Sequence, residues 1–353
     1  MEIGSEFWGV PLSEKENNLL CGNVRNALSG RTALELVARD LRQERGAKSI
    51  YMPAYCCESM MEPFKKQGYV IKLYAVEPYS KTIHRQIFTD HGCDAILLMD
   101  YFGFEAEETS VFAMIEKLRG TAVILDKVQT AFTKTAAEEY ADYTVTSWRK
   151  WFFSCAATAD KKCGEWLVPE ADAENERYIS LRRNAARLKA DYIEKGIGAK
   201  PKFLVQFGEA EELLDTDFSS YSAEEQSLDE LKHADVDLIV SRRRENAKLI
   251  MDWLKDMPQE IIRPLFAELS DRDVPLFVPV LVRKELRDKL RHYLIENDVY
   301  CPVHWPSELG GANILYDGEL SLVCDQRYGY EDIEREMNLI REFLIDNGYL
   351  LQS

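Results

Sequence analysis

The 353-residue sequence lacks several patterns that mark particular classes of protein. It contains no CxxC pair and only five histidines, so we expect no metal site. Its eight cysteines follow no disulfide framework, which favours reduced thiols in a cytoplasmic protein. No apolar run reaches the length of a membrane span, and the first residues, MEIGSEFWGVPLSEKENN, lack the basic and apolar regions of a signal peptide.

Positive charge is also scarce. The chain has 44 lysines and arginines against 61 aspartates and glutamates, which gives a formal net charge of -17. Such an acidic chain is repelled by phosphate backbones and by anionic lipid, so we expect neither nucleic acid nor a membrane as its partner. The rest of the composition, 46% hydrophobic and 30% charged, is typical of a globular protein, and the length fits two domains.

From Arg31 onward the chain alternates between helix-like and strand-like segments. A helix is expected over residues 31–46, because Gly46 is suited to end it in the left-handed conformation. Further helices are expected over residues 57–68 and 109–120, and strands over residues 49–53, 70–76, 95–103, 122–126 and 143–148. This alternation predicts a mostly parallel sheet covered on both faces, in which ligands gather at the carboxyl ends of the strands.

The second half of the chain has a different character. Residues 170–230 are rich in charge and helix-like, and a domain boundary is expected near residue 236. Beyond it we expect helices over residues 242–257, 284–298 and 330–348 and strands over residues 275–282, 299–305 and 319–325. The sequence therefore predicts a large α/β domain over residues 1–235 and a small α+β domain over residues 236–353.

The turn that opens the first predicted helix is a candidate anion site. Its residues are Ser29, Gly30, Arg31 and Thr32. Free N–H groups at a helix start favour an anion, and Gly30 lets the backbone approach a phosphate closely. The alternative is that Ser29 simply caps the helix.

Two later strand ends carry functional groups. Asp126 ends the apolar run AVILD, where a buried carboxylate needs a partner, and Gln129 follows it; alternatively, Asp126 caps the next turn. Lys150 lies between Trp148 and Trp151 in YTVTSWRKWFF. Apolar surroundings make the neutral, nucleophilic amine accessible, unless the lysine extends from an edge strand into solvent.

These three features together match the needs of a pyridoxal phosphate site. An anion-binding turn anchors the phosphate, a carboxylate keeps the pyridine nitrogen protonated, and a lysine forms the Schiff base.

The order of motifs along the chain resembles that of the DegT/DnrJ/StrS-type sugar aminotransferases. The motifs are SGRTAL, YMPAYCC, YFGF, LDKVQTAF, SWRK, RRRENAKL, VHWP and LVCDQRY. The resemblance extends from about Gly22 to the C-terminus. It implies the aspartate-aminotransferase fold (fold type I of the pyridoxal phosphate enzymes), with a mostly parallel, seven-stranded-type sheet. It also implies a homodimer with the site at the subunit interface.

The resemblance implies a role for each matching residue. Lys150 would form the Schiff base, Asp126 would pair with the pyridine nitrogen, and Gln129 would touch the phenolic oxygen of the ring. Ser147 would contact the phosphate. The other phosphate-binding residues would be Gly30, Arg31 and Thr32.

The sequence departs from the family pattern at three places. Where the family places an aromatic residue that stacks on the cofactor ring, this chain has Cys57, so stacking falls to its sulfur or to Tyr55. The histidine usual before the YxG segment is Asp100. The glycine pair expected after the lysine is absent.

Two C-terminal residues are candidates for contact with substrate. His304 matches a histidine that faces substrate in the family; otherwise it is a surface-loop residue. Arg327 can clamp a carboxylate of the amino donor, or it can form a structural salt bridge to the acidic helix that follows.

The leading hypothesis is an aminotransferase that moves an amino group from a donor such as glutamate to a keto acceptor, for example a nucleotide-linked keto sugar. Two alternatives stay open. One is a lyase, dehydratase or desulfurase on the same fold, and the other is a non-catalytic descendant that binds a ligand.

Overall fold

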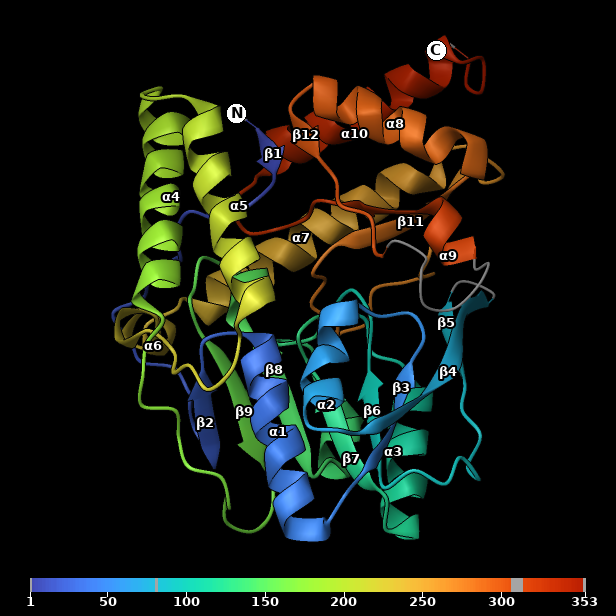
Figure 1. Cartoon of the computed structure of the whole chain (residues 1–353). Coiled ribbons are helices and arrows are strands. Elements are labelled where there is room, and N and C mark those ends of the chain that lie inside the picture. The colour runs from blue at the N-terminus through green and yellow to red at the C-terminus, as the bar shows by residue number, and fades with distance from the viewer. Residues whose placement is uncertain (1, 80–81, 306–313, 352–353) are drawn as a thin grey trace.

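The computed structural model describes residues 2–79, 82–305 and 314–351. Its centre is an eight-stranded sheet with the strand order β2-β9-β8-β7-β6-β3-β4-β5 (Figure 1). The four pairs in the middle, from β8 to β4, are parallel, and the pairs at both edges are antiparallel. The strands are β2 (Val24–Ala27), β3 (Ser49–Pro53), β4 (Val70–Tyr79), β5 (Thr82–Gln86), β6 (Ala95–Met99), β7 (Ala122–Asp126), β8 (Tyr143–Ser147) and β9 (Ala157–Lys161).

This sheet confirms the predicted mostly parallel α/β architecture. It has eight strands rather than seven, because β5 folds back on β4 as an antiparallel hairpin at the edge. All residues of β6, β7 and β8 are buried, as expected for parallel strands with both faces covered. The carboxyl ends of β7 and β8 lie side by side, since Asp126 is the register partner of Val145.

Helix α1 (Gly30–Arg45) packs on β8 and β9, and its ends follow the local sequence. Ser29 is the N-cap, with its side chain accepting a hydrogen bond from the Thr32 N–H. Gly46 ends the helix at φ 65°, a conformation that glycine adopts without strain. The start of α1 is thereby fixed beside the carboxyl edge of the sheet.

The other helices cover the sheet and build the rest of the molecule. The short η1 (Glu58–Met60) contacts α1 and α2, whereas α2 (Glu62–Lys66) and α3 (Glu107–Arg119) pack on the sheet. Helices α4 (Glu176–Lys195) and α5 (Lys200–Thr216) pack against each other as a hairpin (Figure 1). After them come α6 (Glu225–Lys232), the long α7 (Val236–Lys255), α8 (Lys284–Glu296), α9 (Ile314–Gly318) and α10 (Tyr330–Asp346). No helix within the described ranges is long and apolar enough to cross a membrane.

Two small sheets complete the C-terminal part. An antiparallel sheet joins β10 (Ile262–Pro264), β11 (Val278–Val282) and β13 (Glu319–Leu322). The N-terminal strand β1 (Ile3–Gly4) pairs in parallel with β12 (Val299–Tyr300). The start of the chain therefore lies against its C-terminal part (Figure 1). The division of the chain between residues 235 and 236 stays a prediction.

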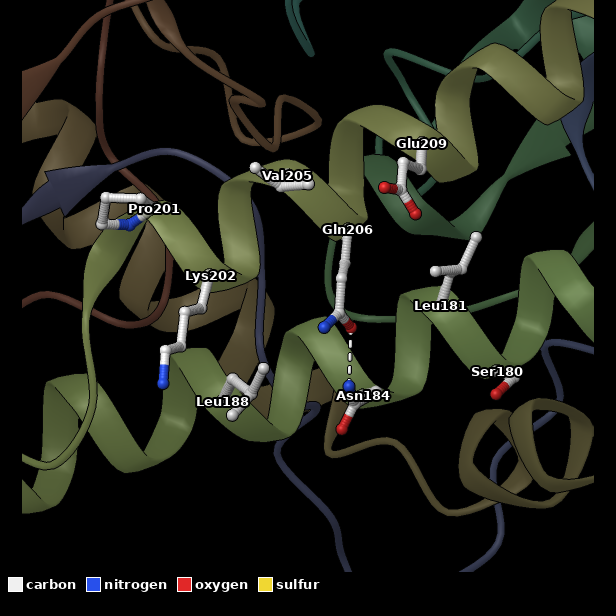
Figure 2. Close-up of a pocket in the computed structure, with 9 residues that line it drawn as sticks. All are labelled: Ser180, Leu181, Asn184, Leu188, Pro201, Lys202, Val205, Gln206 and Glu209. Carbon is white, nitrogen blue, oxygen red and sulfur yellow. Dashed lines mark hydrogen bonds between the residues drawn. The ribbon is translucent and has the colours of Figure 1, made fainter.

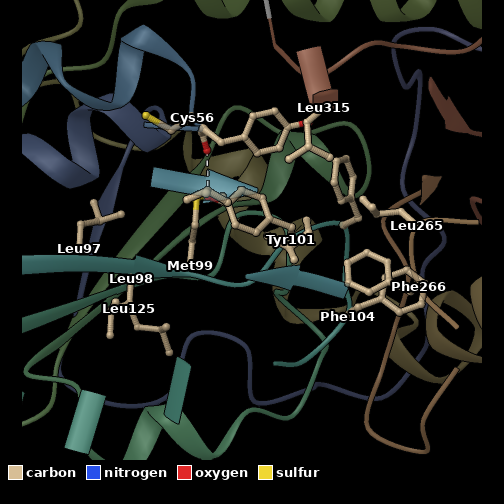
Figure 3. Packing of buried hydrophobic residues seen from close by; sticks show 14 of the residues in the cluster. Cys56, Leu97, Leu98, Met99, Tyr101, Phe104, Leu125, Leu265, Phe266 and Leu315 are labelled. Carbon is tan, nitrogen blue, oxygen red and sulfur yellow. Dashed lines mark hydrogen bonds between the residues drawn. The ribbon is translucent and has the colours of Figure 1, made fainter. Parts of the chain in front are cut away.

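One apolar core runs through both parts of the chain. Figure 3 shows Met99 of β6 and Leu125 of β7 within it. At its other side Phe104 stacks on Phe266, with ring centroids 4.2 Å apart and planes 9° apart. Because this packing is continuous, it fixes the C-terminal part against the carboxyl edge of the central sheet.

Several predicted elements differ from the structure. The helix expected over 57–68 is split into η1 and α2, and the strand expected over 95–103 stops at Met99. The strand expected over 299–305 forms only Val299–Tyr300. The run YTVTSW leaves the sheet at Ser147.

Candidate functional site

A cavity of about 640 Å³ lies at the carboxyl ends of the central strands and is bounded on its other side by the C-terminal part. Residues from many separate segments of the chain line it. Nine of the predicted site residues are among them: Gly30, Arg31, Cys57, Asp126, Gln129, Ser147, Lys150, His304 and Arg327. The fold thus gathers most of the predicted site in one place. Thr32 and Tyr55 do not line the cavity.

Asp126 presents a buried carboxylate to the cavity. The residue is 1% exposed, and its Oδ1 accepts a hydrogen bond from the Val128 N–H at 2.8 Å. No cation and no second donor from the described part of the chain contacts this carboxylate. Burial therefore raises the pKa of Asp126 to about 7. A buried carboxyl with a free oxygen fits a cationic or N–H partner that the chain itself does not supply.

Lys150 enters the same cavity from the neighbouring strand end. The chain leaves β8 at Ser147 and forms a single 3-10 turn, η3 (Trp148–Lys150), which carries the lysine to the sheet edge. Its Nζ has no hydrogen bond or ion pair to any described residue, and its side chain is open to the cavity. Enclosure by the protein, together with the nearby Arg149, lowers the pKa of Lys150. Both effects favour the neutral amine.

The start of α1 forms a tight wall beside Ser147. A Cβ on Gly30 would lie 3.3 Å from the Cβ of Ser147, so only glycine fits there without displacing its neighbour. The first N–H groups of α1 have no acceptor inside the helix, and Ser147 lines the same end of the cavity. Together these groups can bind an anion.

The other residues of this turn hold the helix itself. Ser29 Oγ lies 3.0 Å from Thr32 Oγ1, which donates to the Phe218 carbonyl at 2.6 Å. The hydroxyl of Thr32 is therefore directed away from the cavity. The guanidinium of Arg31 donates to Asp215 at 2.5 Å, so its charge is already paired. Although Arg31 also lines the cavity, the backbone at Gly30 is therefore the part of this turn that is available to an anion.

Gln129 and Cys57 border the cavity, whereas Tyr55 is packed beneath it. Gln129 is 4% exposed and its Oε1 accepts a hydrogen bond from the Phe102 N–H at 2.6 Å. The Cys57 Sγ accepts from Ser59 Oγ at 3.0 Å. The ring of Tyr55 is completely buried, and its hydroxyl donates to the His304 carbonyl. Of the two candidates for stacking on a cofactor ring, only Cys57 reaches the cavity.

His304 is held at the C-terminal side of the cavity. Its Nδ1 lies 3.0 Å from Ser321 Oγ, and its ring packs against Phe102 and Phe277. Its backbone N–H donates to Glu319 at 2.7 Å. The imidazole is therefore rigidly placed.

Arg327 lines the cavity, but its guanidinium is fully engaged. It pairs with Asp325 at 2.8 Å and donates to the carbonyls of Ser5 at 3.2 Å and Glu6 at 3.1 Å. It also lies over the ring of Phe7, 4.1 Å from the centroid. The expected structural salt bridge thus exists, but its partner is Asp325 rather than the helix that follows. Arg327 fastens the N-terminal segment to the C-terminal part.

A cluster of charged residues beside Lys150 was not predicted from the sequence. Arg149 forms an ion pair with Glu211, and Arg182 lies 3.1 Å from Glu6 and 3.5 Å from Glu211. Burial acts to raise the pKa of Glu211, but Arg149 and Arg182 hold it at about 2. Only Arg149, as the neighbour of Lys150, carries a local signal. The other three come from distant segments.

A second hollow lies on the surface between α4 and α5 and contains none of the predicted site residues (Figure 2). Its floor is closed by a hydrogen bond of 2.7 Å from Asn184 to Gln206. In the described part of the chain, no group of three or more His, Cys, Asp or Glu side chains is arranged to hold a metal ion.

No protein-family model matches the sequence, and no curated protein sequence matches it. Solved structures do match. The aminotransferase TlmJ from Streptoalloteichus hindustanus is 15% identical, with a TM-score of 0.64 over 92% of this chain and 86% of that chain. Helicobacter pylori PseC, an aminotransferase involved in the biosynthesis of pseudoaminic acid, is 14% identical, with a TM-score of 0.62 over 96% and 99%. NtdA from Bacillus subtilis, solved with bound cofactor PMP, is 17% identical, with a TM-score of 0.61 over 90% and 72%.

These comparisons establish the fold. The chain adopts the architecture of the aminotransferases over almost its full length, so the predicted fold class is confirmed.

Proposed function

We propose that this protein is a pyridoxal phosphate-dependent aminotransferase of the DegT/DnrJ/StrS type. The observation that carries the proposal is a cavity, beside the contact of Gly30 with Ser147, that is lined by both Asp126 and Lys150. Among the described residues, neither side chain has an ion-pair partner, and Asp126 accepts only the hydrogen bond from the Val128 N–H. These are a free buried carboxylate, a free amine of lowered pKa and an anion site, on a fold shared with aminotransferases. Because the fold alone does not assign the reaction, the proposal rests on the side chains that line the cavity.

The residues of the cavity fit pyridoxal phosphate. Asp126 would hold the protonated ring nitrogen, which supplies the missing partner of its buried carboxylate. The start of α1 at Gly30 and the hydroxyl of Ser147 would hold the phosphate. Gln129 would contact the phenolic oxygen, and the sulfur of Cys57 would lie against the ring. When bound, the cofactor withdraws electrons from the substrate carbon that bears the amino group.

Lys150 would perform the proton transfer. Its amine is neutral more readily than that of an ordinary lysine, because desolvation by the protein that surrounds the cavity and the charge of Arg149 lower its pKa. A neutral Nζ beside the cavity can accept a proton from the α-carbon of the amino donor and later return it. His304 would border the substrate, since its ring is fixed at the opposite side of the cavity.

The wider context is also proposed by resemblance. The donor would be an amino acid such as glutamate, and the acceptor a keto compound such as a nucleotide-linked keto sugar. We propose a homodimer located in the cytoplasm. All eight cysteines lie in the described part of the chain and none is paired, which agrees with a reducing compartment.

A single-turnover experiment tests the reaction. The purified protein is loaded with pyridoxal phosphate and mixed with glutamate, and the 2-oxoglutarate released is compared with the amount of protein. An aminotransferase releases about one equivalent before any acceptor is added. The variant Lys150→Ala should release at least ~10²-fold less in the same time. Cofactor binding without release of 2-oxoglutarate from glutamate, or of the corresponding 2-oxo acid from any other amino donor, would favour a lyase on the same fold.

A further inference from the structure

The residue that follows Lys150 is held more firmly than Lys150 itself. Trp151 is completely buried, and its backbone N–H donates to the Trp148 carbonyl at 2.9 Å, which closes the turn η3. Beyond Trp151 the chain is irregular until β9 begins at Ala157. The direction in which Lys150 points therefore depends on what holds Trp151.

The indole of Trp151 ties this turn to the segment that carries Asp126. Its Nε1 donates to the carbonyl of Val128 at 2.9 Å. That carbonyl belongs to the peptide that joins Val128 to Gln129, and the N–H of Val128 donates to Asp126 at 2.8 Å. One indole thus links the lysine turn to the segment that carries the carboxylate of Asp126 and the amide of Gln129.

The carbonyl of Trp151 is held from the C-terminal part. It accepts hydrogen bonds from Gln326 Nε2 at 2.7 Å and from Arg243 Nη2 at 3.3 Å. The Arg243 guanidinium also lies 4.7 Å from the centroid of the Trp151 ring. The turn is therefore held from two opposite sides.

Arg243 is a costly residue to bury for packing alone. It is completely buried, and its remaining donors bind the Pro275 and Leu276 carbonyls at 3.2 and 3.0 Å and Gln326 Oε1 at 2.8 Å. All these acceptors are neutral, and no carboxylate in the described ranges forms an ion pair with it. Burial of a cation in this way is expensive, which points to a specific role.

We propose that Trp151, Arg243 and Gln326 are positioning residues that aim Lys150 at the cofactor site. The inference rests on the proposed function, because it assumes that Lys150 reacts with pyridoxal phosphate. The hydrogen bond from the Trp151 indole and the hydrogen bonds to the Trp151 carbonyl fix the position and orientation of the turn. They thereby fix the position of the Lys150 Nζ relative to Asp126. A displacement of roughly 1 Å at a reacting atom can cost ~10²-fold in rate.

The chain contains a matched control for the indole. Trp148 lies on the other side of Lys150 in the same turn and is only 3% exposed. Its Nε1 is buried without a hydrogen-bond partner among the residues that the structure describes. Substitution of either tryptophan by phenylalanine keeps a buried aromatic ring, but only Trp151→Phe removes a hydrogen bond.

The test measures covalent attachment of pyridoxal phosphate to Lys150 in the cofactor-free protein. Attachment is trapped with borohydride over time, quantified by mass spectrometry of the Lys150 peptide, and followed over a range of cofactor concentrations. We expect Trp151→Phe to lower the maximal rate constant by ~10-fold or more, with the half-saturating concentration changed by less than ~2-fold. Trp148→Phe should stay within ~2-fold of wild type in both values. Gln326→Leu, which keeps Arg243 but removes one of its acceptors as well as the donor to the Trp151 carbonyl, should lower the rate by ~3–10-fold.

A merely structural role of Trp151 would lower stability and weaken cofactor binding. It would not lower the maximal rate constant while leaving the half-saturating cofactor concentration nearly unchanged. Equal rates for Trp151→Phe and Trp148→Phe would overturn the positioning role while leaving the proposed function intact. Failure of the wild-type protein to attach pyridoxal phosphate at Lys150 would overturn the proposed function, and this inference with it.

Discussion

Gly30 and Ser147 meet at a contact so close that a side chain on Gly30 would have to displace Ser147. A Cβ there would lie 3.3 Å from the Cβ and 3.7 Å from the Oγ of Ser147. This contact joins the start of α1 to the end of β8, where the phosphate would bind.

The substitution Gly30→Ala should weaken cofactor binding. The added methyl group pushes Ser147 away and covers the N–H groups at the start of α1, so we expect the affinity for pyridoxal phosphate to fall ~5–10-fold. Fluorescence titration of the cofactor-free protein measures this.

Gly208 provides the matched control. It lies inside α5, and a Cβ there would meet nothing within 4 Å. Gly208→Ala should raise the free energy of unfolding by ~1 kcal/mol and leave cofactor affinity unchanged. Equal affinities for both variants would contradict the assignment of the phosphate site.

Asp126 should make the cofactor-free protein less stable as the pH rises. Its pKa in the folded protein is about 7, against an ordinary pKa of 3.8 for an aspartate. Because the folded state holds the proton more tightly, the stabilisation is fully present below pH ~4 and is lost as the pH rises to ~7. Asp126→Asn removes this dependence. We therefore expect the free energy of unfolding of the variant relative to wild type to increase by ~3 kcal/mol between pH 4 and pH 8.

Asp142 provides a control of opposite sign. It is buried, and ion pairs with Lys117 and Arg45 at 2.6 and 2.8 Å lower its pKa despite burial. Asp142→Asn should destabilise the protein at pH 8 and matter little once the pH falls below the lowered pKa. Urea unfolding of both variants across this range checks the prediction; parallel curves for Asp126→Asn and wild type would contradict it.

Arg149 should keep Lys150 reactive. Arg149→Gln removes a nearby cation and leaves Glu211 less neutralised, and both changes raise the pKa of Lys150. We expect an amine-selective reagent to label Lys150 ~3–10-fold more slowly at pH 8, with the pH profile moved to higher pH. Arg183→Gln, whose partners are Glu224 and Glu230, should leave labelling unchanged. An unchanged profile for Arg149→Gln would refute this role.

Arg327 should matter for stability more than for donor binding. Arg327→Met leaves the carboxylate of Asp325 buried without its cation and frees the N-terminal segment at Ser5. We expect the free energy of unfolding to fall by ~2–3 kcal/mol and the KM for glutamate to change by less than ~2-fold. If Arg327→Met raised the KM for glutamate at least ~10-fold at unchanged stability, Arg327 would instead bind the carboxylate of the amino donor.

The parts of the fold that sequence could predict are those with strong local patterns. The buried runs 95–99 and 122–126 are continuous apolar segments, and Gly46 marks the end of α1. The helix expected over 57–68 failed because Pro63 cannot donate its backbone N–H, so the chain starts a new helix there. Strand β9, with the sequence ATADK, has no apolar run, and the apolar positions of its short alternation are only alanines. Its pairing with β2 and β8 therefore decides its structure.

The site divides in the same way. Asp126 and Lys150 could be found because each ends a strand-like run, and parallel strand ends meet at one edge of the sheet. The ion pair of Arg182 with Glu6 joins residues far apart in the sequence, and no local sequence pattern predicts it. The same holds for the clamp of Gln326 on Trp151.

The most informative single measurement is the visible absorption spectrum of the purified protein with pyridoxal phosphate, recorded before and after borohydride. We predict a yellow band that disappears on reduction, with the added mass on the peptide that contains Lys150, and no such band in Lys150→Ala. A protein that stays colourless with the cofactor, or a band that persists unchanged in Lys150→Ala, would contradict the proposed site.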